Sequence, residues 1–130
     1  MDDIVAMHEE VFETRLDLSI YEKGLIFRRS DEGLVGYVLF QAVDGFADLH
    51  YIAVAPTLRG HGHGARLLDI FLEHMESAGI SAVTLEVRSD NVAAIKLYES
   101  FDFECIHVRK GYYKDGADAL LMKIEFDVGC

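Results

Sequence analysis

Glycines and histidines alternate in the segment Arg59-Gly60-His61-Gly62-His63-Gly64, which precedes a predicted helix. Glycine lets a backbone approach a ligand closely, and the N–H groups at a helix start carry partial positive charge. The segment therefore favours a cradle for an anion such as a phosphate or a diphosphate. The alternative interpretation is that the glycines only shape a loop, because a glycine cluster between strand and helix is a weak signal by itself.

Other nucleotide-binding motifs fit this segment less well. Gly60, Gly62 and Ala65 match a dinucleotide-binding fingerprint, and Glu86 stands near the position of its ribose-binding acid. Residues 55–59, however, separate the first of these glycines from the predicted strand before it, and only about half a dinucleotide-binding domain follows. No Lys-Ser or Lys-Thr pair closes the glycines, so a P-loop is excluded.

A second group of polar side chains lies between Glu86 and Tyr98. On the helix predicted there, Asn91 and Tyr98 are seven residues apart and share one face. Glu86 precedes them on a strand, opposite an alternating apolar set. Each residue also has a structural interpretation: Glu86 as a solvated strand residue, Asn91 as a helix cap and Tyr98 as a half-buried core residue.

The elements that would position these groups form an α/β pattern. Periodicity and turn residues predict a helix over 4–12, strands over 25–29, 34–43 and 47–54, a helix over 65–78, a strand over 81–88, a helix ending at 100, and strands over 103–110 and 117–126. Turn residues separate the first three strands, which predicts antiparallel pairing. The strand over 81–88 follows a helix, so we expect it to pair parallel with 47–54. Gly79 stands where a helix-ending glycine is expected.

The composition predicts a single domain over residues 1–130. The chain has 12 Lys and Arg against 23 Asp and Glu, a net charge of −11. Wrapping a nucleic acid needs clustered basic residues, so we expect no nucleic-acid partner. A basic partner or a neutral small molecule fits better.

Cysteine use and hydropathy favour a cytoplasmic protein. Cys105 and Cys130 form no C-x-x-C pair, and His61 and His63 have no third ligand nearby, so we expect neither disulfides nor a metal. No leader and no segment of membrane-spanning length is visible, so we expect no membrane partner.

Two motifs together resemble the GCN5-related N-acetyltransferase (GNAT) superfamily. Arg59-x-x-Gly62-x-Gly64 before an amphipathic helix is similar to its coenzyme A diphosphate loop. Residues 85–104, LEVRSDNVAAIKLYESFDFE, resemble the RimI-type branch, which acetylates the N-terminal alanine of a ribosomal protein. The resemblance extends over 49–122. It implies the GNAT α/β fold, a mixed and mostly antiparallel sheet, splayed between the strands 47–54 and 81–88 with coenzyme A in the opening.

The resemblance also implies a role for each site residue. Glu86 would be the general base and Tyr98 the general acid, while Tyr112 and Tyr113 would flank the incoming substrate. Cys105 would be a structural thiol. The residues implied to bind acetyl-CoA are Ile52, Ala53, Val54, Arg59, Gly60, His61, Gly62, His63, Gly64, Ala65 and Asn91.

The implied activity is transfer of an acetyl group from acetyl-CoA to the α-amine of a protein N-terminus, such as an Ala-starting ribosomal protein. Two alternatives stay open: acetylation of a small-molecule amine, and a non-catalytic acetyl-CoA-binding module.

The sequence departs from the family pattern in three places. Only residues 1–3 precede the first predicted helix, so we expect that the family's first strand is either absent or lost by truncation of the reading frame, and a homodimer is one arrangement that would cover the exposed edge. Asp102 replaces a turn glycine and is expected to be left-handed. Residues 13–23, which help to select the substrate in relatives, show little similarity to them.

Overall fold

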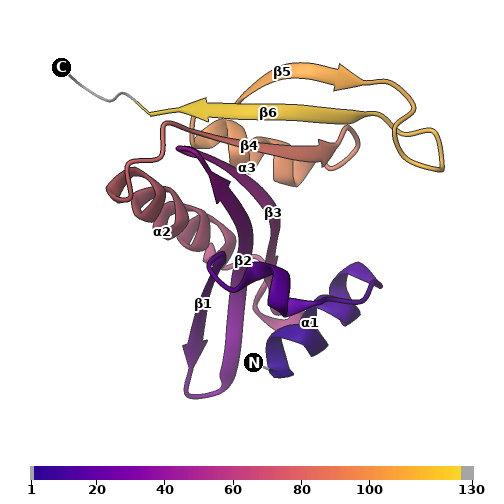
Figure 1. Cartoon of the computed structure of the whole chain (residues 1–130). Helices are drawn as coiled ribbons and strands as arrows, with labels where there is room; N and C mark the ends of the chain where they lie inside the picture. Colours follow the sequence, from indigo (N-terminus) through magenta and orange to yellow (C-terminus); the bar gives the residue numbers. More distant parts are fainter. Residues whose placement is uncertain (1, 127–130) are drawn as a thin grey trace.

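The computed structural model describes residues 2–126 (Figure 1). The elements in chain order are α1 (Asp2–Phe12), the short 3₁₀ helix η1 (Leu18–Tyr21), β1 (Leu25–Ser30), β2 (Gly33–Val43), β3 (Phe46–Val54), the 3₁₀ turn η2 (Pro56–Leu58), α2 (His63–Ser77), β4 (Ala82–Arg88), α3 (Val92–Ser100), β5 (Glu104–Arg109) and β6 (Ala119–Glu125). The six strands form one sheet in the order β1-β2-β3-β4-β6-β5.

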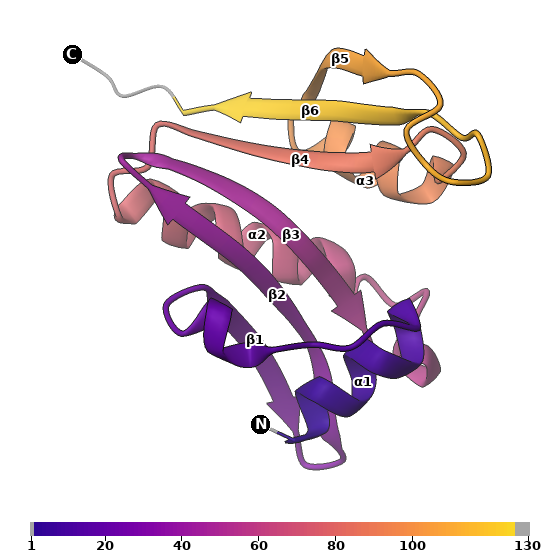
Figure 2. The ribbon, with the colours of Figure 1, turned by 45° about the vertical axis from the view of Figure 1, so that its right-hand side comes forward.

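The sheet is mostly antiparallel and splays in the middle. β1, β2 and β3 form two hairpins, while β6 lies antiparallel between β4 and β5. The parallel pair β3 and β4 joins the two halves through three residue pairs, from Phe46 with Ala82 to Asp48 with Thr84. Beyond them β3 runs away from β4 (Figure 2). The predicted mixed, splayed sheet is therefore confirmed.

The helix α2 covers one face of the sheet and builds the main core. Its apolar residues recur every three or four positions, so Leu67, Leu68, Phe71 and Met75 all face inward and are buried. The Phe71 ring packs on that of Phe40 in β2, with 5.0 Å between their centroids. This packing fixes the position of the loop that leads into α2.

On the opposite face, α1 and η1 cover a smaller core (Figure 2). Alternate residues of a strand point to opposite faces, so Tyr37 and Leu39 face this core while Val38 and Phe40 face α2. The His8 ring of α1 is buried here, with Nδ1 at 2.8 Å from the hydroxyl of Tyr37.

Local signals placed most elements within a few residues of their observed bounds. α2 begins two residues earlier than predicted, because Gly62 takes a left-handed conformation (φ 82°) and its carbonyl accepts a hydrogen bond from Arg66. Gly79 (φ 80°) and Asp102 (φ 73°) are left-handed as expected. η1 was not predicted.

Two expectations concern the ends and surface of the chain. Within residues 2–126 no strand precedes α1, which leaves β1 at one edge of the sheet. In the same residues, no helix has the length and apolar character needed to cross a membrane. Cys130 lies outside the described residues.

Candidate active site

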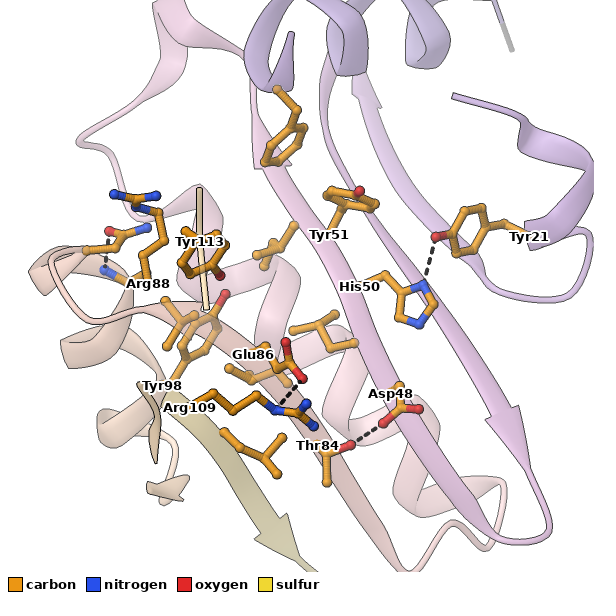
Figure 3. A pocket seen from close by; sticks show the side chains of 18 residues that line it. Tyr21, Asp48, His50, Tyr51, Thr84, Glu86, Arg88, Tyr98, Arg109 and Tyr113 are labelled. Atoms are coloured by element: carbon orange, nitrogen blue, oxygen red, sulfur yellow. Dashed lines mark hydrogen bonds and ion pairs between the residues drawn. The ribbon is translucent and has the colours of Figure 1, made fainter. Parts of the chain in front are cut away.

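A cavity of about 920 Å³ opens where β3 and β4 separate (Figure 3). Its walls come from both of these strands, from α1, η1, α3 and β6, and from the end of β5 and the loop that follows. The lining residues are Phe12, Tyr21, Asp48, Leu49, His50, Tyr51, Ile52, Thr84, Leu85, Glu86, Val87, Arg88, Asn91, Ala94, Tyr98, Arg109, Tyr113 and Leu121.

The end of the β3–β4 pairing creates this cavity. Asp48 and Thr84 are the last paired residues, and the Thr84 hydroxyl donates a hydrogen bond to the Asp48 carboxylate. Beyond this point the side of β3 that faces β4 has no strand partner, over residues 49–54. Backbone N–H and C=O groups need partners when they are covered. This strand edge is therefore available to a ligand.

Glu86 projects into the cavity from β4. It lies two residues after Thr84 on the same face, while its neighbours Leu85 and Val87 are buried in the core. Its Oε1 atom is 3.3 Å from Nε of Arg109 on β5, and its side chain is 32% exposed. The ion pair holds the carboxylate at the cavity wall, where it is within reach of solvent.

Tyr98 reaches the same cavity from α3 (Figure 3). It is only 7% exposed, and its ring packs edge-to-face on Phe103 with 5.8 Å between centroids. Burial raises the pKa of the Tyr98 phenol to about 12. The hydroxyl therefore keeps its proton at neutral pH and can act as a donor.

Asn91 begins α3 as predicted. Its side-chain oxygen accepts a hydrogen bond from the backbone N–H of Ala94, at 3.2 Å, and so caps the helix. Because the side-chain oxygen of Asn91 already accepts this bond, only its amide N–H groups remain as hydrogen-bond donors. Asn91 lines the large cavity, so a ligand there could accept a hydrogen bond from them.

A second cavity of about 330 Å³ lies at the glycine loop. It is lined by Val11, Phe12, Ile52, Ala53, Val54, Leu58, Arg59, Gly60, Gly62, His63 and Gly64. Phe12 and Ile52 line both cavities, so the two adjoin. Gly60 and Gly62 have φ values of 83° and 82°, and a Cβ on either would meet nothing within 4 Å. The loop therefore presents open backbone surface.

The start of α2 adds hydrogen-bond donors to this second cavity. The first N–H groups of a helix have no acceptor within it, and here they belong to His63, Gly64 and Ala65. Free N–H groups, the helix dipole and the nearby Arg59 together suit a diphosphate.

Three predicted site residues line neither cavity. His61 is exposed, Ala65 lies in the first turn of α2, and Tyr112 is 52% exposed. Tyr113 does line the large cavity, and its ring packs on that of Tyr112 with 5.2 Å between centroids. Burial, followed by the charge of Glu86, raises the pKa of Tyr113.

Arg88 holds the side of the large cavity that Tyr113 lines. Its guanidinium lies over the Tyr113 ring, 4.8 Å from the centroid, and its Nη2 atom is 2.7 Å from the Asp115 carboxylate in the β5–β6 loop. Its Nε also pairs with Asp90 at 3.1 Å. These ion pairs tie the loop after β5 to the end of β4.

Two features of the site were missed from the sequence. One is the ion pair of Arg109 with Glu86, and the other is a hydrogen bond of 2.7 Å between the Tyr21 hydroxyl and Nδ1 of His50. The alternation of β3 puts His50 on the face of Asp48, a signal that could have found it. Nothing local to Tyr21 indicates its contact with His50, which is 29 residues away. Between residues 2 and 126, no group of three or more His, Cys, Asp or Glu could hold a metal ion.

Residues 3–103 match the model of the acetyltransferase (GNAT) family. The chain belongs to this family. Its membership confirms the predicted family and class of enzyme, and it explains the splayed sheet and the glycine loop as parts of one family fold.

Sequence relatives within the GNAT family point to one branch. The ribosomal protein bS18-alanine N-acetyltransferase of Escherichia coli is 36% identical over 107 residues, which cover 79% of this chain and 72% of that protein. An uncharacterised protein of Mycobacterium leprae is 51% identical over 79 residues, which cover 60% of this chain but only 21% of that protein. The chain thus matches about a fifth of the length of this second relative.

The comparison of structures agrees with the sequence similarity to the E. coli enzyme. The crystal structure of the E. coli ribosomal-protein-S18-alanine N-acetyltransferase has a TM-score of 0.85 to this chain at 26% identity, and the match covers 97% of this chain and 87% of that one. The predicted resemblance to the RimI-type branch of the GNAT family is therefore confirmed.

Proposed function

We propose that this chain transfers the acetyl group of acetyl-CoA to the α-amine of a protein N-terminus, such as an Ala-starting ribosomal protein. One observation carries the proposal: the carboxylate of Glu86 and the protonated phenol of Tyr98 line one cavity at the β3–β4 splay. The similarity to the E. coli enzyme that acetylates the alanine of ribosomal protein bS18 supports the choice of acceptor.

The two adjoining cavities fit acetyl-CoA. When bound, acetyl-CoA supplies the acetyl group as a thioester. Residues 60–65 would hold the diphosphate, although His61 and Ala65 line neither cavity, with the free N–H groups at the start of α2 as donors. Arg59 and His63 would add side-chain contacts, and Asn91 an amide donor. The unpaired edge of β3 at Ile52, Ala53 and Val54 would bind the pantetheine arm.

Proton transfers would then be divided between two side chains. The α-amine of a peptide has a pKa of about 7.7 to 8.0, so a large share of it is protonated at neutral pH and cannot attack. The Glu86 carboxylate would take this proton, through a water molecule, and release the amine lone pair. Backbone N–H groups of β3 would stabilise the oxyanion. The Tyr98 Oη–H would protonate the departing sulfur, since its pKa of about 12 keeps it protonated beforehand. The second proton that the nitrogen loses in forming the amide would return to the Tyr98 oxygen through water.

The acceptor would enter past the tyrosine pair. Tyr113 lines the cavity and Tyr112 lies exposed beside it, so the two rings form the outer wall along which a peptide could lie. The net charge of −11 would also attract a basic ribosomal protein.

A release assay for free coenzyme A tests the proposal. The substrates are acetyl-CoA and a short peptide with an N-terminal alanine, compared with spermidine as a small amine. Glu86→Gln keeps the size of the side chain but removes the base, so turnover should fall by about 10²- to 10⁴-fold while acetyl-CoA binding persists. Turnover of spermidine alone would contradict a peptide acceptor. Binding of acetyl-CoA without turnover of either would indicate a non-catalytic module.

A further inference from the structure

His50 on β3 and Glu86 on β4 both line the large cavity near the inner end of the splay. Each lies two residues beyond the last paired positions, Asp48 and Thr84, whose side chains meet on one face of the sheet. His50 is the extra residue of a β-bulge in the β2–β3 pairing. Leu49 before it and Leu85 before Glu86 are both buried in the core under α2, so His50 and Glu86 lie on the opposite face of the sheet. Both line the large cavity, and Figure 3 shows them on its two sides.

Tyr21 is hydrogen-bonded to one ring nitrogen of His50. The Tyr21 hydroxyl is 2.7 Å from Nδ1 of His50, and Tyr21 is only 4% exposed. When the hydroxyl donates to Nδ1, the proton of a neutral imidazole lies on Nε2. In this arrangement Nε2–H is the donor that His50 offers to the cavity that it lines.

The Tyr21–His50 pair is held firmly. Asp17 caps η1 by accepting a hydrogen bond from the Ser19 N–H at 3.0 Å, which fixes the short helix that carries Tyr21. The rings of Tyr21 and His50 pack edge-to-face with 5.5 Å between centroids. Within residues 2–126, Nε2 of His50 makes no hydrogen bond, so this nitrogen is free to contact a ligand.

We propose that His50, oriented by Tyr21, determines acceptor specificity by donating its Nε2–H to a carbonyl oxygen next to the reacting amine. The inference rests on the proposed function and narrows the substrate class. An oxygen held at His50 directs the neighbouring amine across the cavity towards Glu86. Every peptide N-terminus carries a carbonyl two bonds from its amine nitrogen, whereas a linear polyamine carries none. The preferred acceptors are therefore α-amino carbonyl compounds.

NMR spectroscopy tests the tautomer of His50 without an activity assay. In ¹⁵N NMR spectra of the wild-type protein at pH 8, His50 should be protonated on Nε2 with Nδ1 bare. Tyr21→Phe removes the hydroxyl and keeps the ring, so the His50 signals should shift towards a mixture of tautomers. Protonation of Nδ1 in the wild-type protein would overturn the inference, whatever the enzyme acetylates.

Kinetics test the recognition of the carbonyl. His50→Phe keeps a ring but removes the donor, so the KM for an Ala-starting peptide should rise about tenfold, the range expected for one lost hydrogen bond. His50→Gln keeps an N–H donor and should restore part of the affinity. Tyr21→Phe should raise the peptide KM less, and the double variant Tyr21→Phe/His50→Phe should be no worse than His50→Phe alone.

Two comparisons distinguish a loss of carbonyl recognition from a general loss of activity. In His50→Phe the KM for acetyl-CoA and the kcat/KM for spermidine should both stay within about twofold of the wild-type values. An equal loss with peptide and spermidine, or an unchanged peptide KM, would overturn the inference and leave the proposed function standing. A wild-type enzyme that prefers spermidine to the peptide would overturn both.

Discussion

The side chains of Asp48 and Thr84 are hydrogen-bonded across the last residue pair that joins β3 to β4. This contact lies where the two halves of the sheet part, and the cavity that both residues line begins there. The bond therefore closes the inner end of the candidate active site, while β3 and β4 diverge beyond it.

Replacing Thr84 by Val should loosen this junction. Valine matches the shape of threonine but cannot donate to Asp48, so the free energy of unfolding should fall by about 1 kcal/mol. Urea denaturation measures this change. Thr84→Ser keeps the hydroxyl and serves as the control. Unchanged stability in Thr84→Val together with a loss in Thr84→Ser would show that the methyl group, rather than the hydrogen bond, matters here.

Gly62→Ala should weaken acetyl-CoA binding. Gly62 has φ 82° and lines the small cavity, so alanine would strain the loop by about 1–2 kcal/mol and tilt its N–H groups. The KM for acetyl-CoA should rise several-fold. Gly79→Ala is the matched control, because Gly79 has φ 80° and equally open surroundings but lies at the far end of α2. The control should lose similar stability and keep its KM; a raised KM in both variants would point to a global effect.

Tyr98→Phe should lower kcat and spare the binding of acetyl-CoA. The phenol is the proposed acid, so turnover should fall by about 10²-fold, while calorimetry should show an unchanged Kd. Burial raises the Tyr98 pKa to about 12, so Tyr98 stays protonated between pH 7 and 9. Over this range the pH profiles of the wild-type protein and of Tyr98→Phe should therefore have the same shape. Unchanged turnover in the variant would exclude Tyr98 from the acid role.

His8 and Tyr37 form a buried polar pair that ties α1 to β2, and both side chains are almost completely buried. His8→Leu should cost about 1–3 kcal/mol, because the Tyr37 hydroxyl is left without a partner. The double variant His8→Leu/Tyr37→Phe removes both polar groups and should recover part of this loss. Chemical denaturation of the wild-type protein, His8→Leu, Tyr37→Phe and the double variant gives the coupling between the two side chains.

The same pair should make stability depend on pH. Burial lowers the pKa of His8 below its ordinary value of 6.5. As the pH falls below 6.5, the unfolded chain binds a proton that folded His8 does not, so wild-type stability should decline. The contribution is fully present above pH 6.5. In His8→Leu the decline between pH 7 and 5 should be smaller, and parallel curves for the two proteins would contradict this assignment.

Local sequence signals carried much of the fold and part of the site. The spacing of Leu67, Phe71 and Met75 predicts the buried face of α2, because a helix places such residues on one side. The alternation around Glu86 likewise predicts that it points away from the core. These predictions succeed since each depends on residues close together in the chain. The sequence by itself therefore determined the order of the main helices and strands and the helix-ending Gly79, and its resemblance to the family named Glu86 and Tyr98 as candidates for proton transfer.

Tertiary structure alone decided how these elements form a cavity. The pairing of β3 with β4 stops after Asp48 and Thr84, which are 36 residues apart, and no local pattern encodes that limit. The contact of Tyr21 with His50 is equally remote, and the segment around Tyr21 carried no recognisable signal. A hydrogen bond between distant residues depends on how the helices and sheet pack around it. The geometry that presents Nε2 of His50 opposite Glu86 is consequently a property of the folded chain.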